Sequence, residues 1–246
     1  MHMAKSTSNK QSRAKRGAPV GKNVRKKTRP SRAKQKGAAG RKKKVAPVGK
    51  QRRFSKISRT TSETNILLEL DIDGIGTHSI KTGIPFLDHM LVLFTRHGMF
   101  NLSLKAVGDL DVDIHHTNED VALTLGQAFA KGLIDKKGIR RYGFFLLPMD
   151  EALVRVVLDI SNRPGFFISG LPKRPRGKRV YSFLDCEHFM KSFSQAAGLT
   201  LHITVLSGRD RHHILEAIFK ALARALDMAV SKDPRTDSVP STKGIL

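Results

Sequence analysis

The chain has 246 residues, with 45 Lys and Arg against 21 Asp and Glu, and its formal net charge at pH 7 is +24. Its length suits one large domain or two small ones, and its single cysteine, Cys186, excludes an intrachain disulfide. Apolar runs stay short of the roughly 18 residues of a membrane span, so we expect a cytoplasmic protein that does not enter the membrane.

The positive charge is concentrated at the N-terminus. Residues 1–60 hold 13 Lys and 9 Arg with no acidic residue, whereas the other 23 basic residues face all 21 acidic ones. This quarter lacks apolar periodicity and cannot bury enough surface to offset the cost of ordering it. We therefore expect residues 1–58 to form a disordered tail. The tail is either simply solvated, or binds nucleic acid or another polyanion non-specifically, or is a targeting peptide.

From Asn65 onward, alternating and helical periodicities follow one another along the chain. They predict, in chain order, a strand at 66–72, a helix at 88–97, a strand at 102–107, a helix at 118–133, a strand at 153–160, a helix at 187–197, a strand at 199–206 and a helix at 214–230.

The predicted elements form two similar halves, at about 59–137 and 138–246. In each half a lone histidine opens a helix, a strand and a glycine turn follow, and a histidine pair opens a second helix. His89 precedes the pair at 115–116 by 26 residues, and His188 precedes the pair at 212–213 by 24. This repetition predicts an internally duplicated α+β domain.

Each histidine pair belongs to a His-His-x-x-Glu motif, which ends at Glu119 in the first half and at Glu216 in the second. Residues three or four apart share a helix face, but adjacent residues diverge by about 100°. Each pair is therefore expected to serve two different ions. With the two lone histidines the set suffices for two sites of three His and one Glu, which suit Mn, Fe, Co, Ni or Zn. These candidate ligands are His89, His115, His116, Glu119, His188, His212, His213 and Glu216.

These motifs, with others around them, resemble the imidazoleglycerol-phosphate dehydratase family from about Arg59 to the end of the chain. The matching stretches are TGIPFLDHML at 82–91, DIHHTNED at 113–120, GIRRYG at 138–143, PMDEA at 148–152, HHILEAIFK at 212–220 and PSTKG at 240–244. The chain departs from the family pattern at Leu93, where many members carry Gln, at Asn162 in place of Gly, and at Asp210 in place of Asn.

The resemblance implies a layer of four helices between two four-stranded sheets. It also implies trimers that assemble into a 24-subunit homo-oligomer, with metal sites between subunits. All eight candidate ligands fall on family ligand positions, and which four hold which ion stays open.

The resemblance further implies the reaction, which belongs to histidine biosynthesis. The family converts D-erythro-imidazole glycerol phosphate to imidazole acetol phosphate and water, by way of a diazafulvene-like intermediate. Two Mn²⁺ ions per active site would hold the ring as imidazolate and stabilise its charge. Glu63 is the implied proton carrier, and with the ligands Glu119 and Glu216 it makes up the candidate catalytic carboxylates.

Seven polar or charged side chains match the family's substrate contacts. Guanidinium and ammonium groups give charge-assisted bonds to phosphate oxygens. The candidate substrate and phosphate contacts are Glu63, His97, Arg141, Arg163, Lys220, Ser241 and Lys243.

Two alternatives come from other function classes. A non-catalytic metal-dependent shell with nucleic-acid-binding tails predicts retained metal ligands but lost proton-transfer and phosphate groups, whereas Glu63, Arg141, Arg163 and Lys243 are all present. Another di-metal enzyme, such as a phosphoesterase, predicts more Asp-rich ligands than this histidine-rich set.

Overall fold

The structure is a computed structural model that describes residues 52–174 and 181–246. The Lys/Arg clusters of the expected tail lie outside the described residues. Strand β1 covers Phe54–Thr60, so the expected boundary at Arg59 falls inside the first strand and is too late along the chain. The strand continues through a basic stretch because Ser55 points inward, where its hydroxyl donates to the carbonyl of Ala128 over 2.8 Å.

Each half contains four strands and two helices in the same order, strand-strand-strand-helix-strand-helix. The first half consists of β1 (Phe54–Thr60), β2 (Thr64–Asp71), β3 (His78–Lys81), α1 (Pro85–Gly98), β4 (Asn101–Gly108) and α2 (His115–Gly132). The second half consists of β5 (Tyr142–Met149), β6 (Ala152–Asp159), β7 (Gly165–Ser169), α3 (Phe183–Ala197), β8 (Thr200–Ser207) and α4 (Arg211–Val230).

The two sheets have the same topology. Their strand orders are β1-β2-β4-β3 and β5-β6-β8-β7, and in each sheet the third strand of the half runs parallel to its neighbour while the other pairs are antiparallel. Two sheets with one unusual order in common are the structural signature of the duplication read from the histidine spacing.

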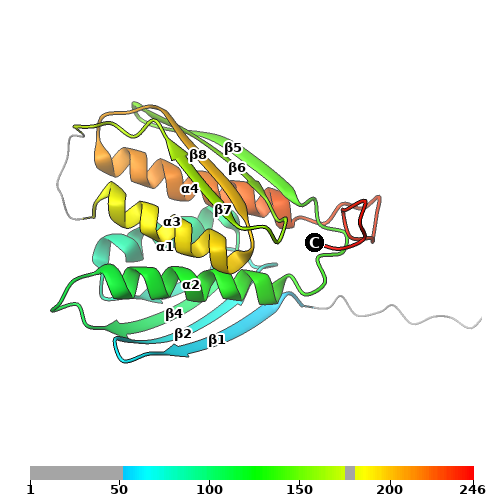
Figure 1. Ribbon diagram of the computed structural model, residues 1–246, viewed down its shortest axis with the longest axis horizontal. Coiled ribbons are helices and arrows are strands. Elements are labelled where there is room, and N and C mark those ends of the chain that lie inside the picture. The colour runs from blue at the N-terminus through cyan, green and yellow to red at the C-terminus, as the bar shows by residue number, and fades with distance from the viewer. Residues whose placement is uncertain (1–51, 175–180) are drawn as a thin grey trace, which may run out of the picture. The chain divides into compact units, whose positions relative to one another are not determined.

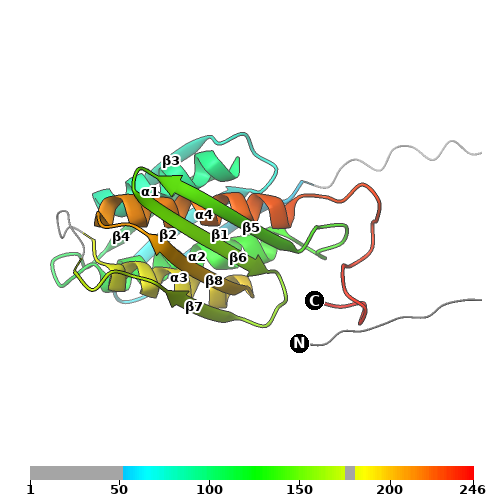
Figure 2. The same ribbon diagram turned by 90° about the horizontal axis from the view of Figure 1, so that it is seen from above.

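The four helices lie between the two sheets (Figures 1 and 2). Helix α2 packs against α3, and α1 packs against α4, so each helix pair joins one half to the other. The expected α+β fold, a four-helix layer between two four-stranded sheets, is thereby confirmed. Within the described residues no helix has the length and hydropathy to cross a membrane.

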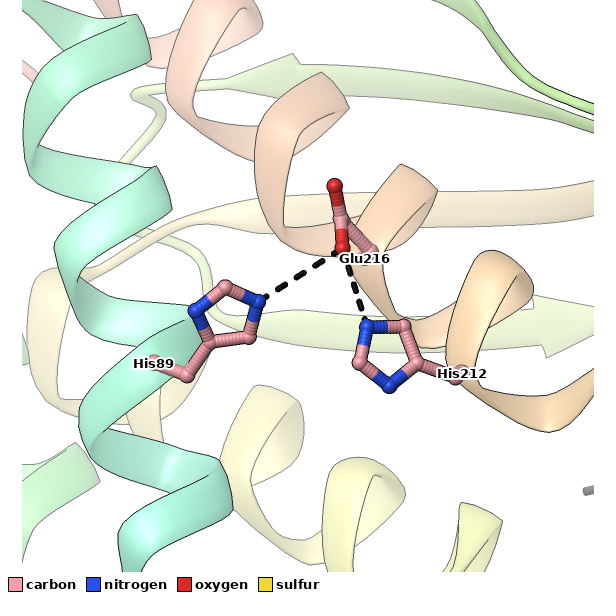
Figure 3. A group of neighbouring side chains, drawn as sticks. All are labelled: His89, His212 and Glu216. Carbon is pink, nitrogen blue, oxygen red and sulfur yellow. Dashed lines mark hydrogen bonds and ion pairs between the residues drawn. The ribbon is translucent and has the colours of Figure 1, made fainter.

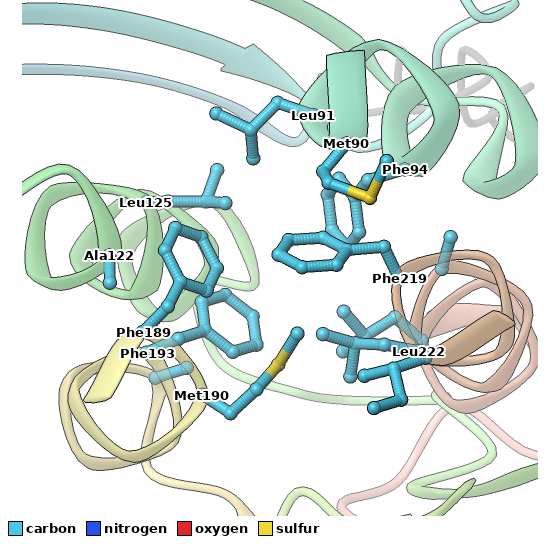
Figure 4. Close-up of a cluster of buried hydrophobic side chains, with 14 of the residues drawn as sticks. Met90, Leu91, Phe94, Ala122, Leu125, Phe189, Met190, Phe193, Phe219 and Leu222 are labelled. Carbon is cyan, nitrogen blue, oxygen red and sulfur yellow. The ribbon is translucent and has the colours of Figure 1, made fainter. Parts of the chain in front are cut away.

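Aromatic and methionine side chains fill the centre of the helix layer (Figure 4). Phe94 of α1, Phe129 of α2 and Phe193 of α3 are fully buried, and their rings meet edge to face with centroids 6.0 and 5.9 Å apart. Edge-to-face contacts of this kind stabilise beyond the area they bury. The core therefore joins three helices from both halves in one cluster.

All four predicted helices and all four predicted strands are present, with ends that shift by a few residues. The alternation did not individually predict β1, β3, β5 and β7. Strand β3 has only four residues and β1 exposes Lys56 and Ser58 on its outer face, so neither has a strong apolar pattern. Strand β5 reads as continuously apolar because it is apolar on both faces.

Gly126 permits the close crossing of α2 and α3. A Cβ atom there would lie 2.6 Å from the carbonyl oxygen of Phe193 and 2.7 Å from the Cβ of Ala196. Because the first of these contacts is with backbone, the neighbouring helix would have to move.

We expect Gly126→Ala to lower the free energy of unfolding by about 1–3 kcal/mol, although Gly to Ala in a helix interior normally raises it by about 1 kcal/mol. Urea denaturation at fixed protein concentration measures the change. The matched control is Gln127→Ala, on the exposed side of the same helix. A Gly126→Ala protein more stable than the parent would contradict the close crossing.

Candidate metal centre and phosphate site

Two helix N-termini position the histidine pairs. Helix α2 begins at His115, whose backbone N–H donates to the carboxylate of Asp113. Helix α4 is capped by Asp210, which accepts from the backbone N–H groups of His212 and His213 over 2.7 and 3.4 Å. Asp is a strong N-cap residue, which explains how it replaces the Asn of the family pattern.

The first cluster joins α1 to α4 (Figure 3). The Oε2 atom of Glu216 lies 3.6 Å from Nε2 of His89 and 3.1 Å from Nε2 of His212. One ligand atom from each of the three residues lies within 4.8 Å of the others, the only such group in the part of the chain that the structure describes. Two imidazoles and a carboxylate aimed at one point are a donor set for a divalent transition metal.

Lys220 stabilises the ionised form of Glu216. Burial favours the neutral acid, but the ammonium of Lys220, which contacts Oε1, and the nearby His212 outweigh it, so the pKa of Glu216 is lowered. This favours the carboxylate form that metal binding requires.

The second cluster joins α2 to α3. Nε2 of His115 lies 3.5 Å from Oε2 of Glu119, and its Nδ1 lies 3.2 Å from Nδ1 of His188. Ser192 donates to the other Glu119 oxygen over 3.3 Å. Glu119 and His188 face opposite nitrogens of the His115 ring, so these ligand atoms do not converge on one point as those of the first cluster do, although the donor types are the same.

Each lone histidine meets the pair of the other half. His89 belongs to the first half and joins His212 of the second, while His188 belongs to the second half and joins His115 of the first. The helix pairing α1–α4 and α2–α3 produces this exchange.

The second histidine of each pair lies outside both clusters. The rings of His115 and His116 are 6.0 Å apart at 70°, and those of His212 and His213 are 6.3 Å apart at 84°. Two histidines of one pair therefore face different partners, as the helix geometry predicts.

Carboxylates contact these two outer histidines. Nδ1 of His116 lies 2.9 Å from Oδ2 of Asp109 and 3.8 Å from Glu63. Nδ1 of His213 lies 2.7 Å from Oε2 of Glu151. Hydrogen bonds that Asp109 and Glu151 accept from the rings raise the pKa values of His116 and His213, respectively. The pKa of Glu151 is lowered to about 2, chiefly because its carboxylate accepts a hydrogen bond from the backbone N–H of Asp210 and also one from the ring of His213.

Four of the candidate phosphate contacts lie together. They line a cavity of about 670 Å³ at the C-terminal segment, and they are Arg141, Arg163, Ser241 and Lys243. The carboxylate of Asp159 lies 2.6 Å from Arg141 and 3.8 Å from Arg163, and it raises the pKa of Arg141. This leaves a cavity with three cationic side chains and one acidic neighbour.

Lys220 and His97 lie elsewhere. Lys220 contacts Glu216 in the first metal cluster and is absent from the lining of the phosphate cavity. Burial and the nearby charges of Lys220 and Arg224 lower the pKa of His97. Both residues therefore lie near α4 and the first cluster. They remain predicted substrate contacts, but they do not line this cavity.

The first cluster and the cavity at the C-terminal segment lie at opposite ends of α4. His212 opens the helix, whereas the backbone N–H of Arg141 donates to the carbonyl of Ala229 at its far end over 2.9 Å. At 1.5 Å per residue, this separation is roughly 25 Å. Figure 2 shows the C-terminal segment beyond that end of α4.

Asp109 and Glu151 are site residues that the histidine spacing does not reveal. Glu151 lies in the turn between β5 and β6, and Glu63 lies in the equivalent turn between β1 and β2. This equivalence within the duplication is the signal that identifies Glu151. Of the departures, Leu93 packs against the core, and Asn162 adopts a φ of 57°, a conformation that Asn tolerates better than most residues.

Comparison with known proteins gives consistent matches. The family model for imidazoleglycerol-phosphate dehydratase matches residues 82–226. Enzymes of that name from Thermoanaerobacter pseudethanolicus and Caldanaerobacter subterraneus are 51% and 52% identical over 194 residues, which are 79% of this chain and 100% of theirs.

Solved structures agree with the sequence matches. The crystal structure of imidazoleglycerol-phosphate dehydratase from Staphylococcus aureus is 37% identical with a TM-score of 0.65, and the match covers 73% of this chain and 99% of that one. The structure of IGPD from Pyrococcus furiosus is 36% identical with a TM-score of 0.67, and the match covers 77% and 100%.

We expect His212→Ala to remove one bound metal ion per chain, because it takes one of only two imidazoles from the first cluster. Equilibrium dialysis against Mn²⁺ followed by elemental analysis gives the stoichiometry. The control is His78→Ala, an exposed histidine on β3 whose ring contacts only the carbonyl of Gly76 among the hydrogen bonds described. Unchanged metal content in the His212→Ala protein would exclude this cluster as a metal site.

Proposed function

Because the chain belongs to the imidazoleglycerol-phosphate dehydratase family, we propose that it converts D-erythro-imidazole glycerol phosphate to imidazole acetol phosphate and water, with two Mn²⁺ ions per active site. The family makes it a hydro-lyase of histidine biosynthesis. The observation that carries the detailed proposal is the convergence of His89, His212 and Glu216 on one point, in a chain that also has a cationic cavity.

The side chains fit a hard or intermediate divalent cation. The clusters offer imidazole nitrogens and carboxylate oxygens, and the thiol of Cys186 is buried with a raised pKa, so it offers no thiolate. His89, His212 and Glu216 would hold one ion, and His115, Glu119 and His188 the other. When bound, the two ions would hold the ring nitrogens of the substrate and stabilise negative charge on the ring.

Glu63 is suited to proton transfer. It lies in the turn between β1 and β2, and its side chain is 48% exposed, so a substrate can reach it. Its Oε2 is 3.8 Å from His116, too far for a hydrogen bond that would occupy it. It would take the hydrogen of the glycerol chain as a proton, that proton would leave with the hydroxyl as water, and tautomerisation of the resulting enol would give the ketone.

Arg141, Arg163, Ser241 and Lys243 would hold the phosphate. Two guanidinium groups and an ammonium provide charge-assisted hydrogen bonds to its oxygens. The cavity they line lies roughly 25 Å from the first metal cluster of the same chain, which a glycerol chain cannot span. One active site would therefore take its metal ligands and its phosphate contacts from different copies.

The ligand sets support the same arrangement. One chain would supply three ligands to each cluster, and His116 and His213 remain outside both. We propose that each of them completes a cluster of another copy, within a homo-oligomer of trimers that forms a 24-subunit shell. Nucleic-acid or polyanion binding by the basic tail stays a prediction from its composition.

An apolar outer face on the second sheet also fits assembly from copies of this chain. One row across the sheet consists of Phe144, Val157, His202 and Phe167, at paired positions on its four strands. The three apolar members are exposed in the single chain. The matching row of the first sheet consists of Lys56, Glu69, Ser103 and Ser79 and is polar. Exposed apolar patches of this kind mark interaction surfaces.

We expect the full chain with Mn²⁺ to form imidazole acetol phosphate from the substrate, and Glu63→Gln to lower kcat by about 10²–10⁴-fold while substrate still binds. The amide keeps the shape but cannot accept the proton. Glu69→Gln is the matched control, because Glu69 pairs with Lys56 on the outer face of the first sheet. Near-normal turnover by Glu63→Gln would remove Glu63 from the mechanism, and an inactive parent would refute the proposed reaction.

Removal of metal with a chelator should abolish turnover and break the shell into smaller oligomers, because ligands shared between copies make metal binding part of assembly. Sedimentation velocity follows the size, and added Mn²⁺ should restore both size and activity. If the metal-free protein sediments as the same large particle, metal does not hold the copies together.

A further inference from the structure

The two histidines outside the clusters share one feature. Each has its Nδ1 within hydrogen-bond distance of a carboxylate, 2.9 Å to Asp109 for His116 and 2.7 Å to Glu151 for His213. The partners come from different places in the two halves, since Asp109 follows β4 and Glu151 lies between β5 and β6.

We propose that Asp109 and Glu151 are positioning residues that fix the rings of His116 and His213 so that Nε2 is presented as a metal ligand to another copy. The inference rests on the proposed function, which supplies the metal ions. It goes beyond it by giving a role to two carboxylates that are not themselves candidate ligands.

The hydrogen bond selects the tautomer. A carboxylate only accepts hydrogen bonds when it is ionised, so a neutral imidazole bonded to it carries its hydrogen on Nδ1. Its lone pair is then on Nε2, which becomes the metal-binding atom. A carboxylate behind a ligating histidine also fixes the ring orientation and increases its basicity.

Glu151 is itself held in place. One of its oxygens accepts from the backbone N–H groups of Arg209 and Asp210 over 3.0 and 2.7 Å, and its other oxygen contacts His213. Because Asp210 caps α4, the same loop sets both the helix start and the carboxylate behind the histidine. Asp150, whose side chain is 67% exposed, lies 3.4 Å from Nε2 of His213 and would have to move aside for a metal.

Asp109 is held differently. Its backbone N–H donates to the carbonyl of Glu63 over 3.2 Å, and its Oδ2 contacts His116. Its Oδ1 is buried and finds no hydrogen-bond partner among the described residues.

The duplication explains why two different carboxylates do the same work. Glu63 and Glu151 occupy the same turn in the two halves, but Glu63 lies 3.8 Å from its histidine and Glu151 lies 2.7 Å from its own. In the first half Asp109 contacts the histidine instead. Glu63 is therefore available for proton transfer in the first half, whereas Glu151 acts as a positioning group in the second half.

The test measures Mn²⁺ affinity directly, by titration calorimetry on the chelator-treated full chain. We expect Asp109→Asn and Glu151→Gln each to weaken Mn²⁺ binding about 10–100-fold. Glu63→Gln, the change at the equivalent turn, should leave the affinity within about twofold. If either positioning variant binds Mn²⁺ as tightly as the parent, the inference fails for that residue.

A double variant separates positioning from a structural role. If Glu151 acts through His213, adding Glu151→Gln to His213→Ala should weaken Mn²⁺ binding no further than His213→Ala alone. A further loss in the double variant would show that Glu151 supports the fold or another ligand and would overturn the role assigned to it. Because binding is measured without turnover, a parent that binds Mn²⁺ but lacks dehydratase activity would refute the reaction and leave this inference standing.

Discussion

Adjacent side chains on an α-helix point about 100° apart, and this constraint determines how the ligating groups of the protein are distributed. A histidine pair cannot serve one ion, so the two imidazoles of each pair face different partners. His115 and His212 meet Glu119 and Glu216 one helical turn later. His116 and His213 meet carboxylates from loops. The directions of the four paired histidines therefore follow from where two helices begin.

The sequence alone predicts the parts of this site that depend on local periodicity. The motif spacing places Glu119 and Glu216 beside their histidines, because residues four apart share a helix face in any context. The exchange of His89 and His188 between halves is beyond such reasoning, since it depends on which helices pack together. The same limit applies to Glu151, which is near His213 in space but 62 residues away along the chain.

The strands show the same division between local and non-local information. Strands β2, β4, β6 and β8 have buried, apolar inner faces, and the alternation predicts them. Strand β3 is held in the sheet by its pairing with β4, and β1 by its pairing with β2, so their own residues show little of the apolar alternation that predicts a strand. The grouping of four candidate phosphate contacts in one cavity likewise depends on the fold, because the C-terminal segment reaches Arg141 at Pro240, whose carbonyl accepts a hydrogen bond from the Arg141 guanidinium over 2.9 Å.

Helix α4 sets the distance between the two candidate sites. It begins at the first cluster and ends beside the C-terminal cavity, and its rigidity prevents the two from closing on one small substrate. Under the proposed function, an isolated chain therefore carries only parts of active sites, and a complete site forms only when copies associate. Under the same proposal, dilution that separates the copies would lower the specific activity.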